Sequence, residues 1–281
     1  MGFIYKQIDP LFEELGEAPD ADALTYISTN NITRLQQKAG ICRLVKFLKD
    51  QSLWTTMAGG FLFGTRVGAA SGTSLPDLKG GTSATLTGGS HNVDGIFLNG
   101  NNADEISFGA RTFTNNYMPS VYLLFASYIR STSTTSSRIN FGPLSSTSTY
   151  RGFQPQTHGQ LGSATSVHLH AYRGDGSRYI GSQAFGAENT NSLFVGAAFS
   201  SNDQKIIGGR NSRADGATTS VATTMTYSAG ATWLLGPFEN ASKTSTEQTT
   251  VSACLFWDSN TTLSIAFISQ LDSLLREFVA L

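Results

Sequence analysis

Charged side chains are scarce in this chain: they make up 14% of its 281 residues, against about 25% in a typical globular domain. The net charge is −1 and the pI is about 6.4. No basic stripe is present that could displace counterions from a phosphate backbone. The densest run of cations, from Arg34 to Lys49, has the spacing of the solvent face of a helix. We therefore expect no nucleic acid among the partners.

Cysteine and long apolar runs are also rare. The two cysteines, Cys42 and Cys254, lie far apart in the sequence; we predict two buried free thiols, with a disulfide between them as the alternative. No Cys/His spacing indicates zinc, and we expect no cofactor. No stretch approaches the 18 apolar residues of a membrane span, and the N-terminus lacks a basic region followed by an apolar core. We expect synthesis in a host cytoplasm without membrane insertion.

Serine, threonine, asparagine and 29 glycines take the place of the missing charges. These residues are poor helix formers and are common in strands and turns. A chain of this length buries roughly 75% of its unfolded surface, so its core needs no disulfide or metal for support. The composition favours one large β-sandwich.

From residue 60 to residue 259, short runs alternate apolar and polar residues, and turn residues separate the runs. No crossover helix lies between them, so the sheets are predicted to be antiparallel. This rhythm predicts an all-β sandwich. The clearest predicted strands are 121–129, 137–142, 166–172, 178–183, 192–199, 204–209, 231–238 and 250–257.

The segment from Asp77 to Gly109 is rich in turn residues with single bulky apolar residues between them. Ile96 and Leu98 are predicted to face one side of a strand, and Ile106 and Phe108 repeat the pattern across a turn at 99–104. We predict strands and turns that close one edge of the sandwich. The glycines predicted to supply positive φ are Gly80, Gly81, Gly88, Gly89, Gly95 and Gly100.

Two helices are predicted to flank the sandwich. Residues 32–50 carry an apolar stripe opposite a basic face, which is typical of a helix packed on a sheet. Residues 263–281 form the second helix, with Asp272 and Glu277 pointing away from its apolar stripe. The candidate N-caps are Asn30 or Asn31 for the first helix and Thr261, Thr262 or Ser264 for the second.

Residues 1–30 are predicted to form a separate attachment segment, and residues 31–281 the sandwich domain with its flanking helices. A helix of a turn and a half cannot bury itself, so it must pack on something else. It either docks on another protein or straps across its own domain. The apolar residues at helical spacing in this segment are Ile8, Leu11, Phe12 and Leu15.

The same segment after Asp77 resembles the start of concanavalin A-like (LamG-type) jelly-roll domains. The matching pieces are Asp77–Gly80, Asp94-Gly95, Ile96–Gly100 and Asp104–Phe108. The end of the chain, a strand followed by LSIAFISQLDSLLREF, is similar to the tail helix of that family. The resemblance implies a concanavalin A-like antiparallel β-sandwich, or jelly roll, with an N-terminal and a C-terminal helix.

A second resemblance covers nearly the whole chain: its order of segments is similar to that of a group of bacteriophage virion proteins. SSNDQKIIGGRNS, in the middle of the chain, also resembles that group. The resemblance implies a non-enzymatic structural protein on the particle surface, as a capsid decoration, head fibre, tail fibre or baseplate appendage. It further implies location in the virion, capsid or tail proteins as partners, and a homo-oligomer. The matching positions are Leu48, Lys49, Leu53, Trp54, Met57, Phe63, Gly64, Leu78 and Lys79.

His168, His170 and Tyr172 alternate along one predicted strand and therefore share a face. Imidazole donors beside an aromatic ring suit a hydroxyl-rich ligand, so this strand is the candidate site for host-surface glycans. The alternative is a half-exposed sheet face without a ligand. As a metal pair, the two histidines lack a carboxylate partner.

A glycoside hydrolase of this fold needs two carboxylates on one face of a strand, on either side of the scissile bond. Asp104 and Glu105 are adjacent and point to opposite faces, and no strand has carboxylates at the required spacing. We therefore predict no enzymatic activity and no catalytic or metal-binding residue. The alternatives, in order, are a freestanding carbohydrate-binding lectin and a glycoside hydrolase. Oxygen-rich loops at 99–104 and 202–203 could hold calcium, although their spacing matches no ordered calcium loop.

Overall fold

The computed structural model describes residues 10–63, 73–99, 104–116, 119–129, 140–143, 152–157, 167–172, 178–185, 194–195, 204–205, 209–210, 220–221, 227–236 and 248–277. Side chains are described in these ranges except at 12–13, 126–129, 140, 248 and 265 and between 152 and 221. The helices are α1 (Pro10–Leu15), α2 (Ala21–Thr29), α3 (Leu35–Asp50), the 3-10 turn η3 (Thr114–Asn116) and α4 (Ile265–Arg276). The strands are β1 (Met57–Leu62), β2 (Ser74–Leu75), β3 (Ala84–Thr87), β4 (Ser90–His91), β5 (Ile96–Asn99), β6 (Glu105–Ala110), β7 (Ser120–Ile129), β8 (Asn140–Pro143), β9 (Gly152–Thr157), β10 (Val167–Tyr172), β11 (Arg178–Phe185), β12 (Phe194–Val195), β13 (Gln204–Lys205), β14 (Gly209–Arg210), β15 (Ser220–Val221), β16 (Thr232–Gly236) and β17 (Gln248–Trp257).

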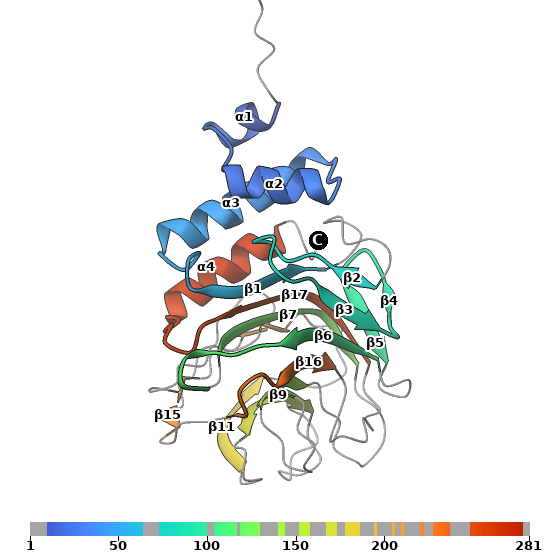
Figure 1. Ribbon diagram of the computed structural model, residues 1–281, viewed down its shortest axis with the longest axis vertical. Helices are drawn as coiled ribbons and strands as arrows, with labels where there is room; N and C mark the ends of the chain where they lie inside the picture. The colour runs from blue at the N-terminus through green and yellow to red at the C-terminus, as the bar shows by residue number, and fades with distance from the viewer. Residues whose placement is uncertain are drawn as a thin grey trace, which may run out of the picture.

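Two antiparallel sheets form the body of the molecule (Figure 1). The seven-stranded sheet has the order β14-β12-β7-β17-β5-β4, and β1 also pairs with β17, beside its C-terminal half. The eight-stranded sheet has the order β11-β10-β9-β8-β16-β6-β3-β2, and β13 pairs with β15 separately. The all-β sandwich predicted from the sequence is confirmed, and each predicted strand overlaps at least one observed strand.

The seven-stranded sheet is apolar on both faces, because its two central strands bury successive residues on opposite sides. On β7, Val121 and Leu123 join a core between the two sheets, while Tyr122 and Leu124 join a second core under the helices. Cys254 lies in the first core and Cys42 in the second, both as free thiols, as predicted. Burial raises the pKa of each thiol, which disfavours the nucleophilic thiolate.

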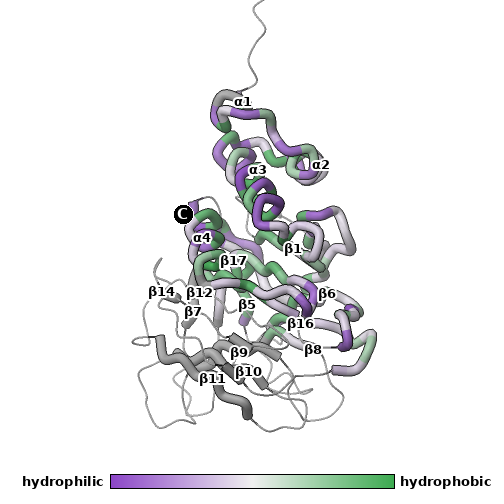
Figure 2. The backbone as a smooth tube through the Cα atoms, turned by 90° about the vertical axis from the view of Figure 1, so that its left-hand side faces the viewer, coloured by the Kyte–Doolittle hydropathy of each residue, from purple (hydrophilic) through white to green (hydrophobic). Residues whose placement is uncertain are grey.

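The helices cover the outer face of the seven-stranded sheet (Figures 1 and 2). Phe47 of α3 stacks on Phe267 of α4, with 5.3 Å between ring centroids, and Phe267 meets Trp257 of β17 edge-on. Helices α1 and α2 both contact α3 and lie beyond it, away from the sheets. Among the helices within the described ranges, none combines the length and the apolarity needed to cross a membrane.

The start of α3 differs from the prediction. The helix begins at Leu35, and its N-cap residue Arg34 makes no side-chain capping bond. Asn30 instead lies at the C-terminal end of α2, a helix that was not predicted from the sequence. Its side-chain amide donates a hydrogen bond of 2.8 Å to Tyr26 O. The predicted caps at Asn30 and Asn31 were wrong because Asn is favoured at both ends of helices, and Asn31 takes a positive φ of 52° here.

Helix α4 begins at Ile265, and of its three predicted caps Ser264 is confirmed, since its hydroxyl accepts a hydrogen bond from Phe267 N. The prediction that Asp272 points away from the apolar stripe was wrong, since only 3% of this residue is exposed. Its carboxylate accepts from Arg276 Nε at 2.7 Å and from the hydroxyl of Tyr122 at 3.2 Å. Two partners at this position allow the carboxylate to be buried.

The segment after Asp77 supplies strands to both sheets. β5 pairs with β17 in one sheet, whereas β6 pairs with β3 and β16 in the other, so residues 99–104 link the two sheets rather than two paired strands. Burial alternates along both strands, with Ile96, Leu98, Ile106 and Phe108 inside, as predicted.

The glycines of this segment divide into two kinds. Positive φ is found at Gly80, Gly88 and Gly89, as predicted. Gly95 also has a positive φ, of 158°, as predicted, whereas Gly81 does not, so that one prediction was wrong. At both, a Cβ would meet neighbouring atoms, Asp77 Oδ2 at Gly81 and the carbonyl group of Val251 at Gly95. Gly100 lies outside the described residues.

Several of the residues that carry the resemblance to virion proteins meet between α3, β1 and the loop after β2, while Phe63 lies in the core between the sheets and Gly64 lies outside the described residues. Lys49 and Lys79 each hold an ammonium over the ring of Trp54, at 5.5 and 5.8 Å from its centroid. Lys79 Nζ donates to Met57 O at 2.9 Å, and Leu78 N donates to Gly60 O at 2.7 Å. The motif therefore fastens the helices to the sandwich.

Candidate functional site

Strand β10 carries the three predicted glycan-binding residues at alternate positions, between β9 and β11. Gln156 and Gln154 on β9 stand opposite His168 and His170. The strand is confirmed, while the side chains of His168, His170 and Tyr172 lie outside the described part of the chain. The backbone thus sets two imidazole positions opposite two amide positions.

The pairing of β10 with β11 changes register between Leu169 and Ala171, next to His170. The two extra residues lie on β11, because Leu169 pairs with Gln183 and Ala171 pairs with Tyr179. The sequence reading missed β9 and its glutamines, because Pro155 in the run GFQPQT argues against a central strand.

The predicted glycan strand and the N-terminal helices lie at opposite ends of the molecule. In Figure 1, β9 and β11 lie at the bottom of the view and α1 and α2 at the top. The order of the eight-stranded sheet places β11, β10 and β9 at the edge opposite β3 and β2.

The predicted attachment residues contact their own chain where they are described. Leu11 of α1 is 4% exposed and Leu15 is half-buried, and both pack against the core under the helices. Ile8 lies outside the described residues, as does the side chain of Phe12. The described contacts are those of a strap across the domain.

Charge complementarity joins this strap to α3. Arg43, Lys46 and Lys49, which the sequence places on the solvent face of a helix, each pair with an acidic residue of the segment before α3. Arg43 Nη1 lies 3.9 Å from Glu14 Oε1, and Lys46 Nζ lies 3.8 Å from Glu17 Oε2. Both of these pairs are about half exposed, so each contributes little by itself.

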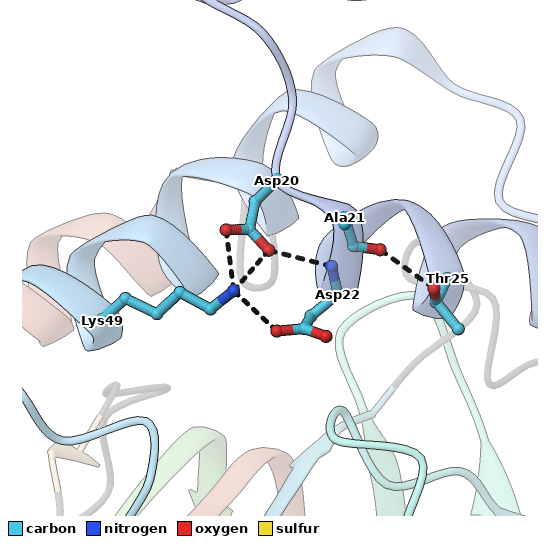
Figure 3. Close-up of polar contacts among 5 residues, drawn as sticks. All are labelled: Asp20, Ala21, Asp22, Thr25 and Lys49. Atoms are coloured by element: carbon cyan, nitrogen blue, oxygen red, sulfur yellow. Dashed lines mark hydrogen bonds and ion pairs between the residues drawn. The ribbon is translucent and has the colours of Figure 1, made fainter.

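Lys49 makes the tightest of these contacts (Figure 3). Its Nζ lies 2.8 Å from both carboxylate oxygens of Asp20 and 2.6 Å from Asp22 Oδ2. Asp20 also caps α2, accepting from Asp22 N at 2.9 Å. Partial burial acts to raise the pKa of Asp20, but the bonds from Lys49 and from backbone amides outweigh it and hold the pKa below its usual value.

A cavity of about 200 Å³ lies between α2 and the loop that follows β2. Tyr26 and Thr25 of α2 line one side, and Asp77 and Gly80-Gly81 of the loop line the other. Asp77 is 5% exposed, and its Oδ1 accepts from Lys79 N at 3.0 Å and from Gly60 N at 3.2 Å. Burial raises the pKa of this carboxyl, against the opposing effect of the two amides and of Arg111 and Lys79.

No group of three potential metal ligands converges within the described ranges. Asp104, in one of the loops considered for calcium, is buried and accepts from Asn99 N at 2.8 Å, so one oxygen stabilises the loop itself. Residues 100–103 and 202–203 lie outside the described residues. Calcium binding therefore stays an untested alternative.

No protein-family model matches this sequence, and no curated protein matches it. Solved structures with a similar fold include a sialidase of Trypanosoma rangeli in complex with sialic acid. It has a TM-score of 0.52 and 12% identity, over 79% of this chain and 33% of that one.

The binding domain of botulinum neurotoxin serotype D is similar to the same degree, with a TM-score of 0.52 and 12% identity over 78% of this chain and 51% of that one. The binding domain of botulinum neurotoxin DC in complex with SialylT has a TM-score of 0.51 and 10% identity, over 78% of this chain and 51% of that one. This chain thus spans between a third and about half of the length of these proteins. At such low identity the likeness shows the fold, a two-sheet antiparallel β-sandwich of the kind found in sialidases and neurotoxin binding domains.

Proposed function

We propose that this protein is a non-enzymatic display module, a glycan-binding β-sandwich held on a larger particle by its helical end. The observation that carries the proposal is the separation of the two ends. The described α-helices gather on one face of the seven-stranded sheet, and β9, β10 and β11 lie at the far edge of the eight-stranded sheet (Figure 1). A ligand at β10 would therefore face away from an attachment at α1 and α2.

Glycan binding is supported by two independent features. The first is the fold, because a sialidase in complex with sialic acid and a neurotoxin binding domain in complex with SialylT both contain it. The second is the polar row on β9 and β10, with His168 and His170 opposite Gln156 and Gln154. Imidazole and amide groups donate and accept hydrogen bonds, and the ring of Tyr172 adds an apolar surface for a sugar.

The finer proposal is that the particle is a bacteriophage virion. Its support is the order of motifs along the chain, and among the motif residues Lys49, Trp54, Met57 and Lys79 meet where α3, β1 and the loop after β2 come together. On this proposal, capsid or tail proteins hold the helical end in a symmetric homo-oligomer. Mass spectrometry of purified particles tests it. Hundreds of copies of the protein per particle indicate a capsid decoration, and a few copies indicate a place on the tail. Absence of the protein from the particles would contradict the virion proposal.

A glycan array probed with the full chain, followed by calorimetry on the best glycan, tests the binding. We expect His168→Ala and Tyr172→Ala each to weaken binding by about ten-fold, equivalent to about 1.4 kcal/mol. His91→Ala is the matched control, because His91 lies on β4 in the other sheet. If His168→Ala, Tyr172→Ala and His91→Ala all bind the glycan with the same affinity, the proposal is contradicted.

The two alternatives give different results in the same experiments. A freestanding lectin would bind the glycan as a monomer and be absent from particles. A glycoside hydrolase, the reading favoured by the sialidase likeness, would release reducing sugar or sialic acid from host polysaccharide. We expect no release above the rate seen without protein.

A further inference from the structure

An open groove of about 570 Å³ lies between α2 and the start of α3. Helix α2 lines it with Leu24 and Ile27, and Leu24 is 41% exposed. Leu35 is 38% exposed and lies on the same side of α3 as the lining residue Lys38, three positions further on. Among the large apolar side chains in the described ranges, only these two leucines and Val93 are so exposed. Two of the three therefore lie beside this groove.

The groove carries positive charge that its own copy does not neutralise. Lys38 lines it, and Arg34 lies one helical turn before Lys38. Neither cation forms an ion pair within the part of the chain that the structure describes. No carboxylate is among the described residues that line the groove. A partner that fits this surface is apolar in part and carries negative charge.

A surplus of negative charge lies at the other end of α3. Lys46 Nζ lies 3.8 Å from Glu17 Oε2 and 3.4 Å from Asp50 Oδ2, so two carboxylates share one ammonium. The side chains of Glu17 and Asp50 are 52% and 59% exposed. The contacts of Lys49 in Figure 3 have the same two-to-one ratio. We call the group of Lys46, Glu17 and Asp50 the Lys46 cluster.

We propose that the groove of one copy binds the Lys46 cluster of a second copy. Both halves of a charge-complementary contact lie on this one chain, which favours a second copy over an unrelated protein. Lys38 and Lys46 are eight positions apart on one helix, about 12 Å along its axis, so the two surfaces of a single copy cannot meet. The proposal rests on the homo-oligomer of the proposed function and assigns its interface.

Analytical ultracentrifugation of the full chain tests the interface. We expect the wild type to associate at concentrations up to about 100 μM, which detects a Kd of that order. Raising NaCl from about 0.1 M to about 1 M shortens the Debye length from about 10 Å to about 3 Å and should weaken the association about ten-fold. Leu24→Asp should weaken it by at least as much. Val93→Asp, at an equally exposed apolar residue of the sandwich, is the matched control and should leave it unchanged.

Charge reversal gives the sharpest test. The groove variant, Arg34→Glu with Lys38→Glu, and the cluster variant, Glu17→Lys with Asp50→Lys, should each stay monomeric, because like charges then face each other. An equimolar mixture of the two should associate again. In the mixture, each variant keeps one native surface, and the two altered surfaces complement each other. Circular dichroism melting of each variant verifies that it is folded.

Three results would each overturn the proposal: a wild type that is monomeric at every concentration, equal association of the wild type and the groove variant, or a mixture of folded variants that stays monomeric. A monomeric wild type whose groove variant is lost from particles would assign the groove to an acidic particle protein and would also overturn it. Absence of the wild type from particles, or absence of glycan binding, contradicts the proposed function and leaves this interface standing, because its readout is the mass of the protein in solution.

Discussion

The two faces of the seven-stranded sheet are packed in different ways by the same strands. The face toward the second sheet is lined by aromatic rings whose centroids lie 5.0–6.4 Å apart. The face toward the helices is mostly aliphatic and contains a buried polar group of three, Tyr122, Asp272 and Arg276. The aromatic residues of the core between the two sheets, contributed by both sheets and their loops, are Phe61, Phe63, Phe108, Phe113, Phe125, Phe141, Tyr227, Trp233 and Phe256.

The difference teaches how each layer is held in position. Aromatic pairs accept offset-stacked as well as edge-to-face arrangements, and both occur in this core, so ring packing admits more than one relative orientation. Between the sheets, orientation is already imposed by strand connections on both sides of the core. A helix packed on a sheet by apolar contacts alone can slide or rotate. The hydrogen bond between the Asp272 carboxylate and the Tyr122 hydroxyl restricts α4 to the few positions in which the two groups meet. Substitutions on the two faces should therefore have different effects.

The largest effect is expected from Phe256→Ala in the sandwich core. The ring contacts four other phenylalanines, and Gly59 has no side chain because this ring occupies the space. We expect a loss of about 3–5 kcal/mol of unfolding free energy, measured by denaturant titration. Leu255→Ala, the neighbour that faces the helices, is the comparison and should cost less. The reverse order would show that the helical core is the more tightly packed of the two.

Asp272→Ala is expected to lower the free energy of unfolding, measured by denaturant titration, by about 3 kcal/mol. The variant leaves Arg276 and the Tyr122 hydroxyl without their shared partner. Arg276 is 14% exposed at its side chain, so partial hydration keeps the loss at the lower end of the range for buried pairs. Glu277→Ala, one residue beyond Arg276 and exposed, is the control and should change stability by less than about 0.5 kcal/mol. If Asp272→Ala has as small an effect as this control, the polar group does not position α4.

A smaller and local effect is expected from Asp20→Ala at the helical end. The variant loses the cap of α2 and the pair with Lys49, together about 1–2 kcal/mol. Hydrogen exchange should accelerate at residues 21–29 and stay unchanged in α4. Asp22→Ala, which loses only the ion pair, should accelerate exchange less.

The same pair predicts a pH dependence. The folded pKa of Asp20 is lowered, so its contribution is complete above the unfolded pKa, near 3.8, and is lost as pH falls through the lower folded value. Exchange in the wild type and in Asp20→Ala should therefore converge in acid and differ at neutral pH. A difference that persists at pH 2 would contradict the assignment to this carboxylate.

The sequence predicted the sandwich well because turn residues and alternating apolar residues are local signals. Strands 121–129 and 250–257 and the cap at Ser264 were found in this way. Helix α2 was missed, since TYIST is rich in β-branched residues, and packing on α3 outweighs that propensity. The cavity was missed for a related reason: Tyr26 and Asp77 carry no shared motif and are 51 positions apart.

By itself, the sequence determined that this chain forms antiparallel strands joined by glycine-rich turns, because strand period and turn chemistry depend on neighbouring residues. It also determined that strands such as VYLLF and ACLFW are buried on both sides, since they have no polar face. The tertiary structure alone decided which face meets the helices, that Asp272 lies inside, and that Lys49 binds Asp20 and Asp22. Those outcomes depend on contacts between residues far apart in the chain, whose energies no local pattern contains.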